Sequence, residues 1–149
     1  MAEITHLTAI ALGSNLGNTE KNLQTAIQKI EANIGQIEDV SSFISSEPEG
    51  FDSEYTFSNA CLLCRTSLEP MQLLEQLKHI EFEMGRTKTK DSYEDRIIDL
   101  DIIFFEDLSF QSIELTIPHP RFMERSFVLL PLREIVKTHH SFWPFLLGN

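Results

Sequence analysis

Residues 95–105, DRIIDLDIIFF, restrict the possible folds of this chain more than any other segment. They are rich in Ile, Leu and Phe and almost free of turn-forming residues, a composition that predicts a β-strand. Because side chains alternate along a strand, the odd-numbered residues from Asp99 to Phe105 are expected on one face and the even-numbered residues from Ile98 to Phe104 on the other. A strand that is apolar on both faces is typical of the buried centre of a sheet.

Asp99 and Asp101 share one face at the start of this strand. Two like charges beside an apolar core repel each other and lose hydration. Three explanations are open: this end of the face reaches water, each Asp caps a loop or pairs with an arginine, or the two carboxylates bind a divalent cation. Proteins bind Mg²⁺ with one or two carboxylates, and water and substrate phosphates complete its coordination. The pair therefore raises the question of a phosphate-binding surface nearby.

The overall composition favours one folded domain over residues 1–149. The chain is 42% hydrophobic and contains eleven Phe residues, which suits a packed core. Its formal net charge of −11 argues against nucleic acid or an anionic membrane as a partner, because both require a basic surface. No apolar run approaches the roughly 20 residues of a membrane span, and the N-terminus does not resemble a secretion signal. We therefore expect a cytoplasmic protein.

Cys61 and Cys64 form a C-x-x-C pattern that invites a redox or zinc interpretation. The surrounding sequence NACLLCRTSL predicts a strand, in which positions three apart lie on opposite faces. A thioredoxin-type motif would open a helix, and a zinc site would need a second pair of ligands. We interpret the two cysteines as buried apolar residues.

The other segments alternate between strand and helix patterns. Strands are expected at 7–13, 37–46, 56–68 and 95–105, and helices are expected within 14–35 and 70–85. Asn18 or Thr19 can cap the first helix and Gly35 suits its C-terminal turn, while Pro70 suits the first turn of the second helix. The order strand, helix, strand, strand, helix, strand is that of ferredoxin-like folds.

Two further segments follow this core. Residues 110–120, FQSIELTIPHP, are expected to contribute to a hairpin, and residues 125–136, RSFVLLPLREIV, to form a short helix that covers one face of the sheet. The predicted fold class is therefore α+β, with a ferredoxin-like βαββαβ core and a C-terminal hairpin and helix extension.

Half of the positive charge is concentrated in two short segments. Of the twelve Lys and Arg residues, six lie within 86–96 and 121–125, namely Arg86, Lys88, Lys90, Arg96, Arg121 and Arg125. Arginine clusters commonly bind phosphates. Each segment alone could also be a solvated loop with paired charges. Because the two segments flank the aspartate pair in sequence, the phosphate interpretation is favoured.

Two smaller patterns remain ambiguous. GSNLGN, at 13–18, follows a strand and opens a helix, but it lacks the spacing of a phosphate-binding glycine loop. We interpret it as a turn that passes close to another group. His119 lies between two prolines and is followed by two arginines, so a ligand contact and a structural role are equally supported.

Together these residues resemble the 6-hydroxymethyl-7,8-dihydropterin pyrophosphokinase family. The resemblance extends over almost the whole chain, and it is carried by ALGSNLGN, SSFISSEPEG, FSNAC, GRTKTKDSYEDRIIDLDII and LTIPHPRFMERSFVLLPLREI. The combination of R-x-x-D-L-D-I with IPHP-x-x-x-x-R-x-F-V-L-x-P-L is highly specific. No single piece would be specific by itself.

The resemblance implies an ATP-dependent diphosphokinase of folate biosynthesis. The enzyme would transfer pyrophosphate from ATP to the hydroxymethyl oxygen of the pterin and release AMP. Asp99 and Asp101 would bind two Mg²⁺ ions, and Arg86 and Arg96 would act with them in catalysis. A monomer is expected.

The resemblance also implies two sets of binding residues. The ATP site would comprise Glu81, Arg86, Lys88, Arg96, Thr116, His119 and Arg125. The pterin site would comprise Ser46, Pro48, Gly50, Phe57, Asn59 and Phe127. Phe57 and Phe127 would stack on the ring while Asn59 reads its edge, which suits a planar heteroaromatic substrate.

Several departures from the family pattern and one alternative function remain. Members often have Gly-Pro before the arginine that corresponds to Arg96, where this chain has Glu94 and Asp95. They commonly have an aromatic or other residue beside the histidine that corresponds to His119, where this chain has Pro120, and the expected pterin loop reads SEPEG with acidic residues flanking the proline. The alternative is a non-catalytic ferredoxin-like module that binds a nucleotide or metal, because fold alone does not determine function. Such a module would need no pterin site.

Overall fold

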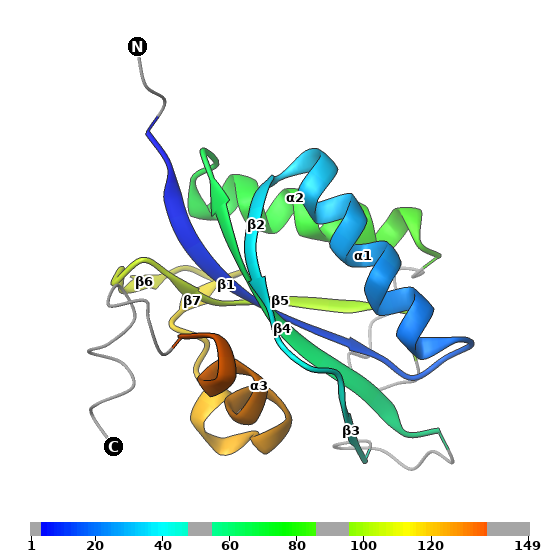
Figure 1. Ribbon diagram of the computed structural model, residues 1–149. Coiled ribbons are helices and arrows are strands. Elements are labelled where there is room, and N and C mark those ends of the chain that lie inside the picture. The colour runs from blue at the N-terminus through cyan, green and yellow to red at the C-terminus, as the bar shows by residue number, and fades with distance from the viewer. Residues whose placement is uncertain (1–3, 48–54, 86–95, 137–149) are drawn as a thin grey trace.

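The computed structural model describes residues 4–47, 55–85 and 96–136 (Figure 1). In chain order the elements are β1 (His6–Ser14), α1 (Thr19–Asn33), β2 (Gly35–Val40), β3 (Ile44–Ser46), β4 (Phe57–Thr66), α2 (Pro70–Glu83), β5 (Asp99–Phe105), β6 (Phe110–Gln111), β7 (Thr116–Ile117), the 3₁₀-helix η1 (Phe122–Glu124) and α3 (Ser126–Val136).

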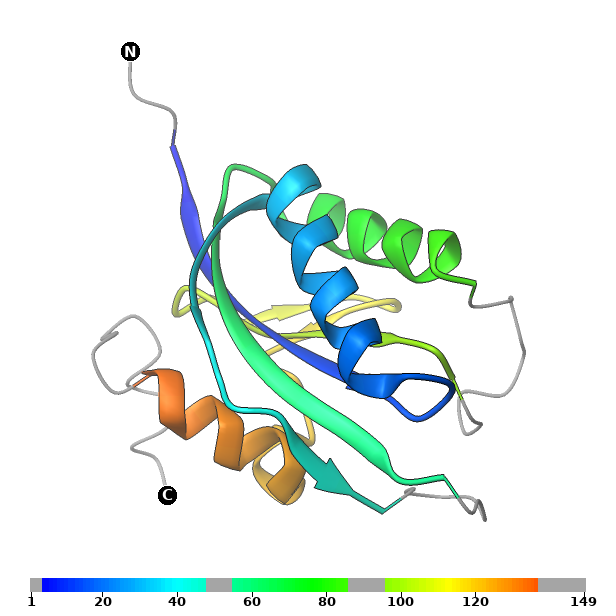
Figure 2. The same cartoon turned by 45° about the vertical axis from the view of Figure 1, so that its right-hand side comes forward.

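The main sheet has the strand order β2-β4-β1-β5, and every neighbouring pair in it is antiparallel. The short β3 also pairs with β4, and β6 pairs with β7 as a separate hairpin. Helices α1 and α2 lie on one face of the sheet and α3 lies on the other (Figures 1 and 2). The predicted ferredoxin-like core with its C-terminal hairpin and helix is therefore confirmed.

Each face of the sheet has its own apolar core. On the side of α1 and α2, buried leucines and isoleucines such as Leu23, Ile30 and Leu77 pack against alternate residues of β1, β4 and β5. On the side of α3, the other alternate residues pack against Leu132 and its neighbours. Burial on both faces explains why β1, β4 and β5 are nearly continuous apolar runs.

The two long helices begin where the sequence indicated. The side chain of Asn18 accepts a hydrogen bond from the Lys21 N–H at 3.1 Å and caps α1. Pro70 occupies the first turn of α2, where its missing N–H leaves no hydrogen bond unmade. These caps fix the points at which the chain leaves β1 and β4.

Gly35 does not form the C-terminal turn of α1, so that prediction is wrong. It is the first residue of β2, and a side chain there would collide with the backbone of Arg65 on β4. The glycine is therefore explained by the close approach of two strands.

The strand predicted at 37–46 is two strands, β2 and β3, separated by residues 41–43. Ser41 takes part in this interruption. Its N–H donates to the Cys61 carbonyl at 2.9 Å, and its hydroxyl accepts from the Cys61 N–H at 2.9 Å. A side chain thus replaces a backbone acceptor, which ends the regular ladder.

The predicted faces of β5 hold for Asp99 to Ile103 but are wrong for Phe104 and Phe105. The pairing of β5 with β1 shifts register between Ala9 and Ile10. Beyond this irregularity Phe104 belongs to the core on the α3 side and Phe105 to the core on the side of α1 and α2. A bulge adds one residue to one strand and so exchanges the faces that follow it.

The interpretation of the two cysteines is confirmed. Cys61 and Cys64 lie on β4 as fully buried free thiols, on opposite faces of the sheet. Burial raises the pKa of Cys61 and raises the pKa of Cys64 to about 12, the latter with help from Glu31 and Glu38. Neither thiol is in the low-pKa environment of a reactive cysteine. Among the described helices, none is both long and apolar enough to cross a membrane.

Candidate active site

The candidate site lies on the α3 face of the sheet, where three strands carry its residues side by side. Gly13 of β1 pairs with Asn59 of β4 on one side and with Asp99 of β5 on the other. The next row on this face joins Cys61, Ala11 and Asp101 in the same way. Since neighbouring strands lie about 4.8 Å apart, the backbones at Asn59 and Asp99 are about 10 Å apart.

Gly13 is buried, and the side chains of Asn59 and Phe57 lie close to its Cα atom. A Cβ atom at this position would lie 3.4 Å from Asn59 Oδ1 and 3.5 Å from Phe57 Cδ1. A side chain at this position would therefore contact both residues. The sheet alternation brings Phe57 and Asn59 to the same face, as predicted, and glycine adds no side chain beside them.

Ser46 and Asn59 contact each other directly. Asn59 is 4% exposed, and its Nδ2 donates to Ser46 Oγ at 2.8 Å and to the Ile44 carbonyl at 3.3 Å. With its amide nitrogen held by β3, the Asn59 oxygen points toward Gly13. A fixed amide oxygen can accept hydrogen bonds from a polar planar ring.

Asp99 and Glu81 extend the site along β5. Arg96 Nη1 lies 3.3 Å from Asp99 Oδ2, and the Arg96 side chain is only 10% exposed. Glu81, on α2, accepts a hydrogen bond from the Leu100 N–H at 2.7 Å. β5 is the edge strand of the main sheet, and Leu100 lies between the two aspartates. The Glu81 carboxylate therefore accepts the hydrogen bond that a further strand would otherwise accept from Leu100.

The aspartate pair has the donor chemistry of a magnesium site. Asp99 and Asp101 supply hard carboxylate oxygens from one face of one strand. Within the described ranges, no group of three or more His, Cys, Asp or Glu side chains could hold a metal by itself. Such a pair fits Mg²⁺, which takes its remaining ligands from water and phosphates.

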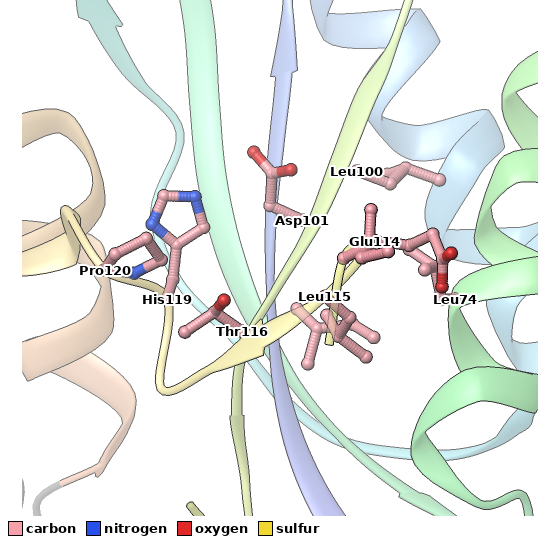
Figure 3. A pocket seen from close by; sticks show the side chains of 10 residues that line it. Leu74, Leu100, Asp101, Glu114, Leu115, Thr116, His119 and Pro120 are labelled. Atoms are coloured by element: carbon pink, nitrogen blue, oxygen red, sulfur yellow. The ribbon is translucent and has the colours of Figure 1, made fainter. Parts of the chain in front are cut away.

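A cavity of about 250 Å³ opens beside Asp101 (Figure 3). Its lining comes from α2, β5, the β6–β7 hairpin and the segment after it: Leu74, Leu100, Asp101, Ile102, Ile113, Glu114, Leu115, Thr116, His119 and Pro120. Thr116, His119 and Asp101, three of the residues singled out in the sequence, thus line the same cavity. Leucines and isoleucines form the apolar part of the wall, a surface that suits a flat base.

His119 is held by the backbone on both sides. Its N–H donates to the Ile103 carbonyl at 2.9 Å, and its Nδ1 accepts from the Arg121 N–H at 3.2 Å. Burial lowers the pKa of His119, Arg125 and Arg121 lower it further, and Asp99 partly offsets them. The ring is therefore neutral at pH 7, and Nε2 carries the proton.

Arg125 and Phe127 lie close together where α3 begins. The Arg125 guanidinium carbon lies 5.9 Å from the centre of the Phe127 ring, within the range of a cation–π contact. Phe127 is partly buried and packs against the core on the α3 side.

Some of the predicted site residues lie outside the described ranges. They are Pro48, Gly50, Arg86 and Lys88, together with Glu94 and Asp95 of one departure from the family pattern.

Sequence reasoning missed Asn15. This residue follows β1 directly, is 2% exposed, and hydrogen-bonds to both Arg96 and Tyr55. The available signal was the GSNLGN stretch, interpreted only as a turn that passes close to another group. Its polar residue between buried segments could have been singled out, because buried amides are nearly always hydrogen-bonded.

Comparison with known proteins gives one consistent family. The profile of 7,8-dihydro-6-hydroxymethylpterin-pyrophosphokinase matches residues 9–137. The 2-amino-4-hydroxy-6-hydroxymethyldihydropteridine pyrophosphokinase of Porphyromonas gingivalis is 37% identical over 134 residues, which cover 88% of this chain and 91% of the relative. The Bacillus subtilis protein of the same name is 38% identical over 131 residues, covering 87% of this chain and 78% of the relative.

A solved structure has the same fold. The Plasmodium falciparum HPPK-DHPS wild type with pteroate aligns with a TM-score of 0.72 and 18% identity over 89% of this chain. This chain spans 39% of that longer chain. The sequence match over most of the chain, together with this shared fold, shows that the protein belongs to the 7,8-dihydro-6-hydroxymethylpterin-pyrophosphokinase family of transferases.

Proposed function

We propose that this chain transfers pyrophosphate from ATP to the hydroxymethyl oxygen of 6-hydroxymethyl-7,8-dihydropterin. The oxygen attacks the β-phosphorus and loses its proton, the bond from the β-phosphorus to the α–β bridging oxygen breaks, and AMP leaves. The main support is the strand register that aligns Asn59, Gly13 and Asp99 across β4, β1 and β5. A flat substrate beside Asn59 would thereby face phosphates held near Asp99.

The pterin site in this proposal is the face of the sheet around Gly13. Phe57 and Phe127 would stack on the ring, and the Asn59 oxygen would accept from its edge, while Ser46 keeps the Asn59 amide in one orientation. Pro48 and Gly50 complete the proposed set. Because Asn59 is already held by β3, binding would cost little side-chain ordering.

The ATP site in this proposal is the cavity beside Asp101. Its apolar wall would cover the base, and neutral His119 would donate from Nε2 to an oxygen acceptor of the nucleotide. The other proposed contacts are Glu81, Arg86, Lys88, Arg96, Thr116 and Arg125. Arginine suits several of these positions because the transferred group carries negative charge over several oxygens.

Asp99 and Asp101 would hold the Mg²⁺ ions, of which we propose two. When bound, Mg²⁺ supplies neutralisation of the phosphate charge and polarisation of the attacking hydroxyl. The protein's own contribution is orientation: Glu81 fixes the backbone between the two aspartates, and Arg96 holds the Asp99 carboxylate. In phosphoryl-type transfer, positioning and charge stabilisation supply most of the acceleration.

The reaction can be tested by incubating the protein with Mg²⁺, ATP and the pterin and separating the nucleotide products by chromatography. Pterin-dependent AMP together with the pterin diphosphate is expected. ADP would refute attack at the β-phosphorus. Binding of ATP without any product would instead favour a non-catalytic nucleotide-binding module.

We also propose that the protein acts as a cytoplasmic monomer with a single domain over residues 1–149. One chain carries all the described site residues, and both described cysteines are free thiols. Sedimentation should give a particle of 17.1 kDa at micromolar concentration. A concentration-dependent dimer would contradict the monomer.

A further inference from the structure

Asn15 is a buried amide at the end of β1 whose role the reaction scheme above does not include. It is the first residue after the strand and only 2% exposed. Burying an amide is costly unless its donors and acceptor are satisfied. The hydrogen-bond partners of Asn15 therefore indicate its role in the structure.

Two of these hydrogen bonds join Asn15 to the backbone of Arg96, one at its carbonyl and one at its N–H. The Asn15 N–H donates to the Arg96 carbonyl at 3.0 Å, and Asn15 Oδ1 accepts from the Arg96 N–H at 2.8 Å. β5 begins only at Asp99, so Asn15 extends the pairing of β1 with this part of the chain beyond the regular strand. The anchored residue is the one whose guanidinium contacts Asp99 at 3.3 Å.

A third hydrogen bond reaches the other half of the site. Asn15 Nδ2 donates to the Tyr55 carbonyl at 3.3 Å, and Tyr55 lies two residues before Phe57 at the start of β4. One side chain thus links the entry to the strand of Phe57 and Asn59 with the entry to the strand of Asp99 and Asp101. An amide can do this because it combines an acceptor with donors on one short side chain.

We propose that Asn15 is a positioning residue of the transfer reaction, which fixes the Arg96 backbone relative to the start of β4 and so aims the Arg96 guanidinium at the phosphates of the nucleotide. This inference rests on the proposed function. Asn15 itself touches neither substrate in this scheme. It acts through Arg96.

The kinetic expectation follows from the sensitivity of transfer reactions to geometry. A misplacement of about 1 Å can lower a rate about 100-fold. For Asn15→Ala we expect kcat to fall by about 10- to 100-fold, while the pterin KM changes by less than about threefold. A raised KM with normal kcat would overturn the proposal.

A double-mutant cycle separates this role from general destabilisation. Asn15→Ala is made alone and in an Arg96→Ala background. If Asn15 acts through Arg96, its effect on kcat should fall to less than about twofold in that background. An equal loss in both backgrounds would show that Asn15 acts independently of Arg96 and would overturn the inference.

Asn22, near the start of α1, provides a matched control, because its side chain bonds to the residues on either side of Asn15. Its Nδ2 donates to Ser14 Oγ at 3.1 Å and to the Leu16 carbonyl at 2.8 Å, so Asn22→Ala also removes turn hydrogen bonds. It leaves the bonds to Arg96 and Tyr55 in place. We expect this variant to keep kcat within about threefold of the unmodified protein. A loss as large as that of Asn15→Ala would assign the effect to the turn as a whole.

Amide hydrogen exchange tests the same contact in the unliganded protein, without any activity. The Arg96 N–H should be protected in the unmodified protein and in Asn22→Ala, and should exchange faster in Asn15→Ala by at least about tenfold. Equal protection of the Arg96 N–H in Asn15→Ala would overturn the proposed role of Asn15. If the unmodified protein forms no AMP while this exchange pattern is found, the proposed function fails and the structural contact stands.

Discussion

Asp99 and Asp101 project from one face of an edge strand, so each carboxylate can serve as a separate oxygen donor. Replacing either by Asn keeps the shape and removes the charge. We expect Asp99→Asn and Asp101→Asn to lower kcat by at least about 100-fold, since a lost metal ligand costs several kcal/mol of transition-state stabilisation. Steady-state kinetics and a Mn²⁺ binding titration would measure the loss.

The control for this prediction is Asp107→Asn, an exposed acid just after β5. It removes the same charge without altering the site, so its kcat and Mn²⁺ affinity should stay unchanged. Full activity in both Asp99→Asn and Asp101→Asn would refute the metal assignment.

His119 should make the stability of the unliganded protein depend on pH. Its pKa is lowered from 6.5 in the folded protein, chiefly by burial and by Arg125. The unfolded chain therefore binds the proton more readily, and the stabilising contribution of neutral His119 is complete above pH 6.5 and declines as the pH falls below it. Relative to His119→Gln, the unmodified protein should lose at most about 1.4 kcal/mol of unfolding free energy for each pH unit below 6.5.

Urea unfolding of both proteins between pH 5 and pH 8 would measure this difference. The difference in unfolding free energy between the unmodified protein and His119→Gln should be constant above pH 7. Below pH 6.5 the unmodified protein should lose stability relative to the variant. A constant difference over the whole range would contradict the lowered pKa.

At the scale of elements, α3 closes the face of the sheet that carries the site. Leu132 is fully buried in the core beneath it, whereas Leu130 on the same helix is 58% exposed. Leu132→Ala should lower the free energy of unfolding by about 2–5 kcal/mol, because it leaves a cavity between helix and sheet. Leu130→Ala should change it by less than about 0.5 kcal/mol.

Chemical denaturation of these two variants would test whether α3 is a structural layer of the fold. Because Phe127 lies in the first turn of the same helix, loosening α3 should also weaken the proposed pterin binding in Leu132→Ala and not in Leu130→Ala. Similar unfolding free energies for both variants would contradict the packing described here.

At this scale, some features can be predicted from neighbouring residues, and others depend on pairing with strands that are distant in sequence. The helix starts at Asn18 and Pro70 follow from capping rules that involve only neighbouring residues. The break at Ser41 and the bulge beside Ile10 do not, because each depends on a partner strand that is distant in sequence. Phe104 and Phe105 were therefore assigned to the wrong faces although the strand itself was predicted.

At the scale of the whole molecule, two apolar cores share the strands β1, β4 and β5. The loss of one core would expose one face of every shared strand, so we expect both to unfold together. Leu77→Ala and Leu132→Ala, one in each core, should each shift a single unfolding transition to lower denaturant concentration. Two separate transitions by far- and near-ultraviolet circular dichroism would contradict a single domain.

The sequence by itself determined the alternation of strands and helices in the ferredoxin-like core, the fold class and the motif residues from which the family resemblance was drawn. These features depend on periodicity, capping and turn chemistry within short segments. The Asp99–Asp101 pair belongs with them, since its shared face follows from strand alternation alone.

Only the tertiary structure decided how the site is assembled. The row of Asn59, Gly13 and Asp99 depends on the register of three strands. The hydrogen bond from Arg96 to Asn15 joins residues 81 positions apart, and the bond from Leu100 to Glu81 joins a strand edge to a helix. Register and edge contacts are set by the packing of the complete sheet, so no local pattern in the chain specifies them.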